Sequence, residues 1–169
     1  MEAFTAVYTN REIIVPTQAE ADSLLQDGYG YRKNKMHHLR GVETLYNVER
    51  GKIHVVDEET NEGLSFQEIL HRLSPDDPEL WIKFIVYKDL RQRGFIIEIH
   101  DQFKVYERGD YGKNPPSYQL KIISEGKPEQ LEKLVHELEK TSKQDLEMKL
   151  AVVDRRGEIV YYGVEEKNL

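Results

Sequence analysis

Few side chains in this chain can exchange a proton near neutral pH. The sequence has six histidines and no cysteine, which excludes thiol nucleophiles and cysteine-based zinc sites. A histidine can act as an acid or a base because its pKa lies near neutrality, whereas a lysine supplies a positive charge. A tyrosine such as Tyr106 needs a strongly altered environment to act as a base, since its unperturbed pKa is about 10. No histidine occurs between Tyr106 and His136, so no acid–base partner follows this tyrosine closely.

The histidines and carboxylates do not follow a metal-binding pattern. His37 and His38 are adjacent, and the side chains of neighbouring residues in an extended segment point to opposite sides. The other histidines have no partner at ligand spacing. Asp76 and Asp77 stand between two prolines, where helix capping is the simpler explanation. We therefore expect no metal and no cofactor.

The composition is that of a globular protein with a highly charged surface. Of the 169 residues, 38% are apolar and 33% are charged, enough for one domain or two small ones. The net charge of −7 is opposite to the usual footprint of a nucleic-acid-binding domain. The segment from Tyr31 to Arg40 is an exception, because it has no acid and carries the cations Arg32, Lys33, Lys35 and Arg40. We interpret it either as a solvated basic loop or as a loop that contacts phosphates within a larger assembly.

The sequence shows no sign of membrane insertion or secretion. No apolar run approaches the roughly 20 residues that a membrane-spanning helix requires. The first residues lack the basic stretch and apolar run of a secretory signal. We expect a cytoplasmic protein without membrane contact.

The first half alternates short strands with short amphipathic helices. Strands are predicted at residues 6–8, 12–15 and 52–56. One helix is predicted over Val42–Glu49. Two more helices begin at pairs with capping-box spacing, namely Thr17 with Glu20 and Ser65 with Glu68.

A boundary with two prolines, Ser74–Pro78, separates the halves. Asp77 can cap a helix that has the following proline at its first position and ends before Gly94. The second half then has predicted strands at 95–99, 103–106, 118–123, 148–153 and 159–162, and a helix that starts at Pro128. This order predicts an α/β (α+β) fold with two small mixed domains, residues 1–75 and 76–169.

Three blocks of the sequence, taken in order, resemble the archaeal tRNA-intron (tRNA-splicing) endonuclease family. They are Val86–Phe95, Phe103–Gly109 and Leu150–Tyr162. The resemblance is strong from Pro78 onward and looser before it. It implies a C-terminal endonuclease-like domain, a nuclease-like mixed sheet flanked by helices, after an N-terminal α/β domain. It also implies metal-free RNA cleavage by attack of the 2′-hydroxyl, which that family performs with a tyrosine, a histidine and a lysine.

Only the tyrosine of the family triad is retained here. Tyr106 matches it, whereas Pro116 stands at the histidine position and Glu147 at the lysine position. A carboxylate beside the scissile phosphate would repel it. Lys149 lies two residues further along the same strand face, about 6.6 Å away, which is too far for an unchanged geometry. The resemblance thus implies a degenerate active site.

The resemblance also implies contacts with other subunits. Enzymes of that family work as four domain-equivalents, two catalytic and two architectural, which some archaea divide between separate subunits. The C-terminal strands pair across subunits, and the turn before this strand docks into another subunit. The matching residues here are Asp154, Arg155, Arg156, Glu158, Ile159, Val160, Tyr161 and Tyr162. The turn is usually acidic but is nearly neutral here, so which subunit donates the docking turn stays open.

Our leading hypothesis is a non-catalytic structural subunit of a heterotetrameric archaeal tRNA-splicing endonuclease. It would act with a catalytic subunit on bulge-helix-bulge motifs of precursor tRNA. One alternative is an active tRNA-intron endonuclease with a rearranged site built from Tyr106, Lys149 and a histidine from elsewhere in the chain. Another is a non-enzymatic RNA-binding scaffold.

Overall fold

The computed structural model describes residues 2–167, which form two compact units that meet between Phe84 and Ile85. This junction falls within helix α4 (Leu80–Gln92). The first turns of α4 belong to the first unit because their side chains pack there: the ring centroids of Phe84 and Phe66 are 5.3 Å apart. The division into domains 1–75 and 76–169 stays a prediction.

The first unit is a six-stranded sheet with helices packed on one face. The strand order is β3-β4-β2-β1-β5-β6, and only the β1–β5 pair is parallel. The strands are β1 (Phe4–Thr9), β2 (Glu12–Val15), β3 (Tyr31–Lys33), β4 (Met36–Leu39), β5 (Ile53–Asp57) and β6 (Gly63–Leu64). The helices are α1 (Gln18–Gln26), α2 (Gly41–Glu49) and α3 (Phe66–Leu73).

The core of this unit lies on the face that carries Ala6, Ile13 and Val55. Each of these side chains is at most 2% exposed. Arg72 of α3 pairs with Asp57 on the same face, because Asp57 follows Val55 at the strand period of two.

Two of the sequence predictions for this unit are corrected by the structure. Residues 31–40 were interpreted as a loop, which is wrong: they form the β3–β4 hairpin. Asn34 and Lys35 adopt φ values of 53° and 65°, which close a tight turn without glycine. The Thr17–Glu20 capping box is also wrong, since Thr17 makes no side-chain capping bond and Glu20 instead accepts a hydrogen bond from the Thr5 backbone N at 2.8 Å.

The other capping box is confirmed. Ser65 Oγ accepts from the Glu68 backbone N at 3.2 Å, and Glu68 Oε2 accepts from the Ser65 backbone N at 2.9 Å. Gly94 ends α4 as expected, with a φ of 90° and its N–H donating to the carbonyl of Arg91. The start of α4 is later than predicted, at Leu80 instead of Pro78.

The second unit is a mixed five-stranded sheet flanked by helices, as predicted. Its order is β11-β10-β9-β8-β7, with β9 and β10 parallel. The elements are β7 (Ile96–Ile99), β8 (Phe103–Tyr106), β9 (Tyr118–Ser124), α5 (Leu131–Lys143), β10 (Glu147–Val153) and β11 (Ile159–Val164). Helix α5 is the crossover that a parallel pair requires, and it begins at Leu131 rather than at Pro128.

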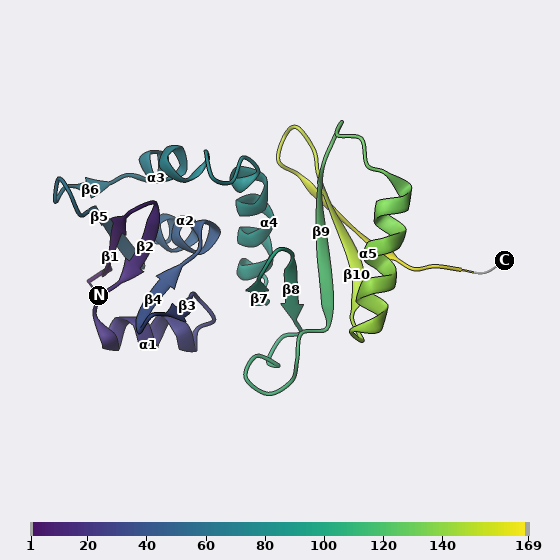
Figure 1. The fold of residues 1–169 in the computed structure, drawn as a ribbon, viewed down its shortest axis with the longest axis horizontal. Coiled ribbons are helices and arrows are strands. Elements are labelled where there is room, and N and C mark those ends of the chain that lie inside the picture. Colours follow the sequence, from purple (N-terminus) through teal and green to yellow (C-terminus); the bar gives the residue numbers. More distant parts are fainter. Residues whose placement is uncertain (1, 168–169) are drawn as a thin grey trace. The chain divides into compact units, whose positions relative to one another are not determined.

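Helices α4 and α5 cover opposite faces of this sheet (Figure 1). On the α4 face, the ring centroids of Tyr87 and Phe103 are 6.1 Å apart. On the α5 face, buried Lys121 reaches Glu137 of α5, with Nζ–O distances of 2.9 and 2.7 Å. None of the helices in the described part of the chain has the length and hydropathy that a membrane span requires.

Candidate functional site

Tyr106, Pro116 and Glu147 lie at the same end of the strands of the second sheet. Strand β8 ends at Tyr106, while β9 begins at Tyr118 and β10 at Glu147. Because β8 is antiparallel to β9 and β9 is parallel to β10, these three strand ends coincide. The Glu147 backbone N donates to the carbonyl of Ser117 at 3.2 Å, which ties β10 to the segment that contains Pro116.

The side chains at this edge do not all share one face. Tyr106 pairs in register with Ile96, whereas Glu147 pairs with Tyr118, on the opposite face of the sheet. Tyr106 and Glu147 therefore approach the edge from opposite sides. Both residue assignments stay predictions, but the geometry offers no facing tyrosine–cation pair.

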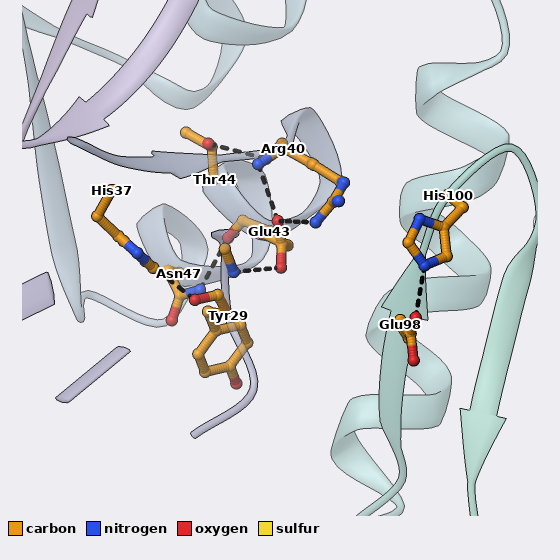
Figure 2. Close-up of polar contacts among 9 residues, drawn as sticks. Tyr29, His37, Arg40, Glu43, Thr44, Asn47, Glu98 and His100 are labelled. Carbon is orange, nitrogen blue, oxygen red and sulfur yellow. Dashed lines mark hydrogen bonds and ion pairs between the residues drawn. The ribbon is translucent and has the colours of Figure 1, made fainter. Parts of the chain in front are cut away.

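Tyr106 is held in its protonated form. Its hydroxyl donates to Glu98 Oε2 at 2.8 Å. Partial burial, together with this carboxylate, raises the pKa of Tyr106 to about 12. At neutral pH the phenol therefore carries its proton and donates this hydrogen bond. The other oxygen of Glu98 contacts His100 Nε2 (Figure 2). One carboxylate therefore contacts both a tyrosine and a histidine.

An open recess beside these positions, here called the acidic hollow, contains carboxylates and no cation. It is lined by Asp110, Asn114, Pro115, Pro116, Ser117, Ser142, Asp145, Leu146 and Glu147. No histidine, lysine or arginine is among these described residues. Its three acids repel a phosphate, and no lining side chain can protonate a leaving oxygen near neutral pH.

Lys149 does not line the acidic hollow. Its Nζ lies 4.1 Å from the ring centroid of Tyr118, on the face of the sheet that α4 covers. Lys149 therefore does not supply a positive charge at the position of Glu147.

The four cations of the β3–β4 hairpin are largely paired within the first unit. Arg32 contacts Asp22 at 2.5 Å, and Lys33 lies 3.7 Å from Glu12. The guanidinium of Arg40 lies 3.8 Å from Glu43 and 4.3 Å from the ring centroid of Tyr31. Lys35 is exposed at the turn. Their role in RNA binding stays a prediction. Nearby carboxylates already neutralise part of their positive charge.

His37 and His38 point to opposite faces of β4, yet both are buried, at 1% and 6% exposure. His37 Nε2 donates to the carbonyl of Tyr29 at 3.0 Å, because a carbonyl can only accept (Figure 2). Burial lowers the pKa of His37, and the neutral ring is part of the core. Gly30 makes this packing possible, since a Cβ there would lie 2.4 Å from His37 Nε2.

Glu43 organises the same region and was not identified from the sequence. It is 1% exposed, and its two oxygens accept from the backbone N–H groups of Gly30 and Arg40, at 2.6 and 2.8 Å (Figure 2). The spacing of Arg40 and Glu43 was the available signal, because a glutamate three residues after a helix N-cap often reaches back to it.

Strand β11 forms an edge of the second sheet. On one side of β11, Val160 and Tyr162 are 51% and 52% exposed. On the other side, the Tyr161 hydroxyl donates to Asp89 of α4 at 2.6 Å, and burial followed by this carboxylate strongly raises the pKa of Tyr161.

The turn before β11 is ordered by its own side chains. Asp154 Oδ1 accepts from the backbone N–H groups of Arg156 and Glu158, at 2.8 and 2.9 Å. The Arg155 N–H donates to Glu125 at 3.1 Å. Strand β11 and the turn before it are therefore held in place by contacts within this unit. Their use as a subunit interface stays a prediction.

Within residues 2–167, no three histidines and carboxylates come together in a group that could hold a metal ion.

Comparison with known families matches both units. The model of the tRNA intron endonuclease N-terminal domain matches residues 5–70, and that of the catalytic C-terminal domain matches residues 80–161. The chain is 31% identical to a tRNA-splicing endonuclease of Pyrococcus furiosus over 94% of this chain and 90% of that protein. It is 30% identical to one of Pyrococcus abyssi over 98% of each chain. It is 35% identical to one of Methanococcoides burtonii over 83% of this chain, but spans only 40% of that longer protein.

Proposed function

The chain belongs to the tRNA intron endonuclease family, and we propose that it is a structural, non-catalytic subunit of a heterotetrameric archaeal tRNA-splicing endonuclease. In this proposal a second subunit with the complete tyrosine–histidine–lysine triad supplies the chemistry. Together the subunits recognise bulge-helix-bulge motifs in precursor tRNA, and the partner cleaves there. The complex works in the cytoplasm.

The state of Tyr106 is the observation that carries this proposal. Cleavage by the 2′-hydroxyl needs a base, an acid and a cation. Tyr106 cannot be the base at neutral pH, because it donates to Glu98 and its pKa is raised to about 12. The acidic hollow, which contains the Pro116 and Glu147 positions, holds neither the acid nor the cation. The fold of the domain is present, while the assigned positions of the acid and the cation lack the side chains that these roles require.

Strand β11 is the part of the chain that we assign to the partner. An edge strand can pair with a strand of another subunit and extend the sheet. Exposed Val160 and Tyr162 supply apolar contacts beside such a pairing. The ordered turn at residues 154–158 adds a second contact.

The first unit, within the proposed domain 1–75, contributes a weak RNA contact in this scheme. Arg32, Lys33, Lys35 and Arg40 lie on or next to one hairpin, where phosphates can compete with their present carboxylate partners. Domain 76–169 provides the frame and the interface.

The test is cleavage of a bulge-helix-bulge RNA under single-turnover conditions. The chain alone should leave the RNA intact, and adding the triad-bearing subunit from the same organism should produce fragments with 2′,3′-cyclic phosphate ends. Cleavage by the chain alone would contradict the proposal. Tight RNA binding without association with any endonuclease subunit would instead favour the scaffold alternative.

His100 supports a second candidate, an active enzyme with a rearranged site. It contacts the carboxylate that Tyr106 also contacts, and its side chain is 57% exposed, so a substrate could reach it. This candidate predicts that the chain alone cleaves RNA and that His100→Gln abolishes this cleavage. His136→Gln, at an exposed position of α5, is the matched control and should leave it intact.

A further inference from the structure

A second recess opens at the same edge of the second sheet, on the face that α4 covers. We call it the aromatic pocket. It is lined by Leu90, Arg93, Phe95, Glu107, Tyr118, Lys149 and Tyr161. Glu107 directly follows β8, Phe95 directly precedes β7 and Tyr118 begins β9, so the pocket lies at the strand ends where the family's triad positions meet.

Three aromatic rings form flat walls of this pocket. The Arg93 guanidinium lies 5.6 Å from the ring centroid of Phe95 and 5.5 Å from that of Tyr161. Asp89 fixes both partners, because it accepts from the Tyr161 hydroxyl at 2.6 Å and pairs with Arg93 at 3.3 Å. The walls are therefore held in place before any ligand enters.

Two donors and one acceptor accompany the rings. Lys149 Nζ lies 4.1 Å from the ring centroid of Tyr118 and forms no ion pair with any described residue. Tyr118 is 6% exposed, and burial, followed by nearby Glu107, raises its pKa, so its hydroxyl keeps its proton. Glu107 is exposed and presents a carboxylate.

These groups fit a nucleobase better than an anion. A phosphate or carboxylate would be attracted by Lys149 and Arg93 but repelled by Glu107, and it would make no use of the rings. A base can stack on aromatic side chains, accept hydrogen bonds at its carbonyl or ring nitrogen, and donate from an amino group. The pocket volume of about 190 Å³ is below the roughly 300 Å³ at which sites for drug-sized ligands begin, so it suits one flat ring system.

We propose that the aromatic pocket binds one unpaired nucleobase of the RNA substrate, with Lys149 donating to its carbonyl or ring nitrogen and Glu107 accepting from its amino group. This inference rests on the proposed function, since it takes precursor tRNA as the ligand. Cytosine, guanine and adenine carry both kinds of group, whereas uracil lacks the amino group, so bases with an amino group are preferred over uracil. The pocket gives Lys149 a role in holding RNA rather than in cleaving it.

Uncharged nucleosides test the pocket without contributions from phosphate. Cytidine, guanosine, uridine and inorganic phosphate are titrated separately into the full chain and followed by NMR chemical shifts. We expect cytidine and guanosine to bind at the aromatic pocket more tightly than uridine, and phosphate to leave its signals unchanged. Lys149→Met should weaken cytidine binding about tenfold, as expected for the loss of one charged hydrogen bond. Glu107→Gln should remove the preference over uridine.

Lys104→Met is the matched control, since this lysine lies in the same sheet but on the opposite face. It should leave nucleoside binding unchanged, and circular dichroism confirms that each variant is folded. The proposal is overturned if the folded wild-type chain binds no nucleoside, or if Lys149→Met has no effect. Phosphate binding stronger than nucleoside binding also overturns it, and identifies the pocket as an anion site.

The failure of this inference is distinguishable from failure of the proposed function. If nucleosides do not bind but mixing with the catalytic subunit restores cleavage, the subunit role stands and the pocket assignment fails. If nucleosides bind but the chain cleaves RNA alone, the pocket stands and the structural role fails.

Discussion

His37 of the first unit and His100 of the second each place a ring nitrogen against a protein oxygen atom, but one histidine is buried and the other is exposed. The residue His37 is 1% exposed, with its Nε2 on a backbone carbonyl, whereas the side chain of His100 is 57% exposed and lies against the Glu98 carboxylate. Figure 2 shows both histidines and the polar groups around them. No substrate can reach His37 without local unfolding, because the core surrounds it.

The comparison separates a histidine that builds the core from one that solvent can reach. His100 is accessible, and its carboxylate partner also accepts a hydrogen bond from Tyr106, whose pKa is raised to about 12. The first unit uses its histidine to build the core. The second unit has a histidine and a tyrosine at its surface that share one carboxylate, and their lack of a catalytic role is part of our proposal.

The largest expected effect is on the cleavage rate of the reconstituted complex. A tyrosine is replaced by phenylalanine either in the catalytic partner or in this chain. In the catalytic partner, this change should slow single-turnover cleavage by at least about 100-fold, as expected for the loss of one acid–base group. Tyr106→Phe in this chain should leave the rate within about twofold. Equal losses from both changes would show that Tyr106 is catalytic.

Replacing the two histidines sharpens the comparison through stability. His37→Gln should reduce the free energy of unfolding by about 1–3 kcal/mol, because a buried ring and its hydrogen bond are lost. His100→Gln should change it by less than about 0.5 kcal/mol, since its pair is exposed. Urea denaturation measures both. A larger loss for His100 would reverse the assignment of structural and surface roles.

Assembly through β11 should depend on its exposed apolar side chains. Tyr162→Lys should weaken association with the catalytic subunit by at least about tenfold, because a charge replaces an apolar contact. Leu131→Lys, at the start of α5 and 73% exposed, is the control and should leave association unchanged. Sedimentation of the mixed subunits compares the two, and an equal response would exclude β11 as a specific interface.

The basic hairpin should have a smaller effect on RNA affinity. Charge reversal at Arg32, Lys33 and Lys35 should weaken binding of precursor tRNA to the assembled complex several-fold and make its salt dependence shallower. The matched control reverses Lys133, Lys140 and Lys143 on α5, which are exposed cations outside the hairpin. An unchanged affinity and slope would leave the hairpin as a solvated surface.

The smallest effect is the pH dependence of stability between pH 7 and pH 5. Because burial lowers the pKa of His37, the unfolded chain takes up this proton more readily than the folded chain. The contribution of neutral His37 is therefore complete above about pH 6.5 and decreases as the pH falls below that value. His37→Gln should flatten this slope and His100→Gln should retain it. A slope that is the same in wild type and His37→Gln would show that His37 does not cause it.

The predictable parts of this chain are those set by contacts between near neighbours in sequence. Ser65 and Glu68 cap α3 as predicted, because both partners of each bond lie within one helical turn. Thr17 and Glu20 have the same spacing, but Glu20 instead binds the backbone of Thr5 on β1. The local pattern is identical, and the neighbouring strand decides which bond forms.

By itself, the sequence determined the order of most helices and strands and the family, and it predicted that a histidine and a lysine are absent from the triad positions. These follow from residue identity and short-range periodicity. Only the tertiary structure decided that Tyr106 is bound to Glu98, that His37 is a core residue, and that Lys149 faces an aromatic pocket. The physical reason is that pKa, burial and pocket geometry depend on groups that folding brings together from distant parts of the chain.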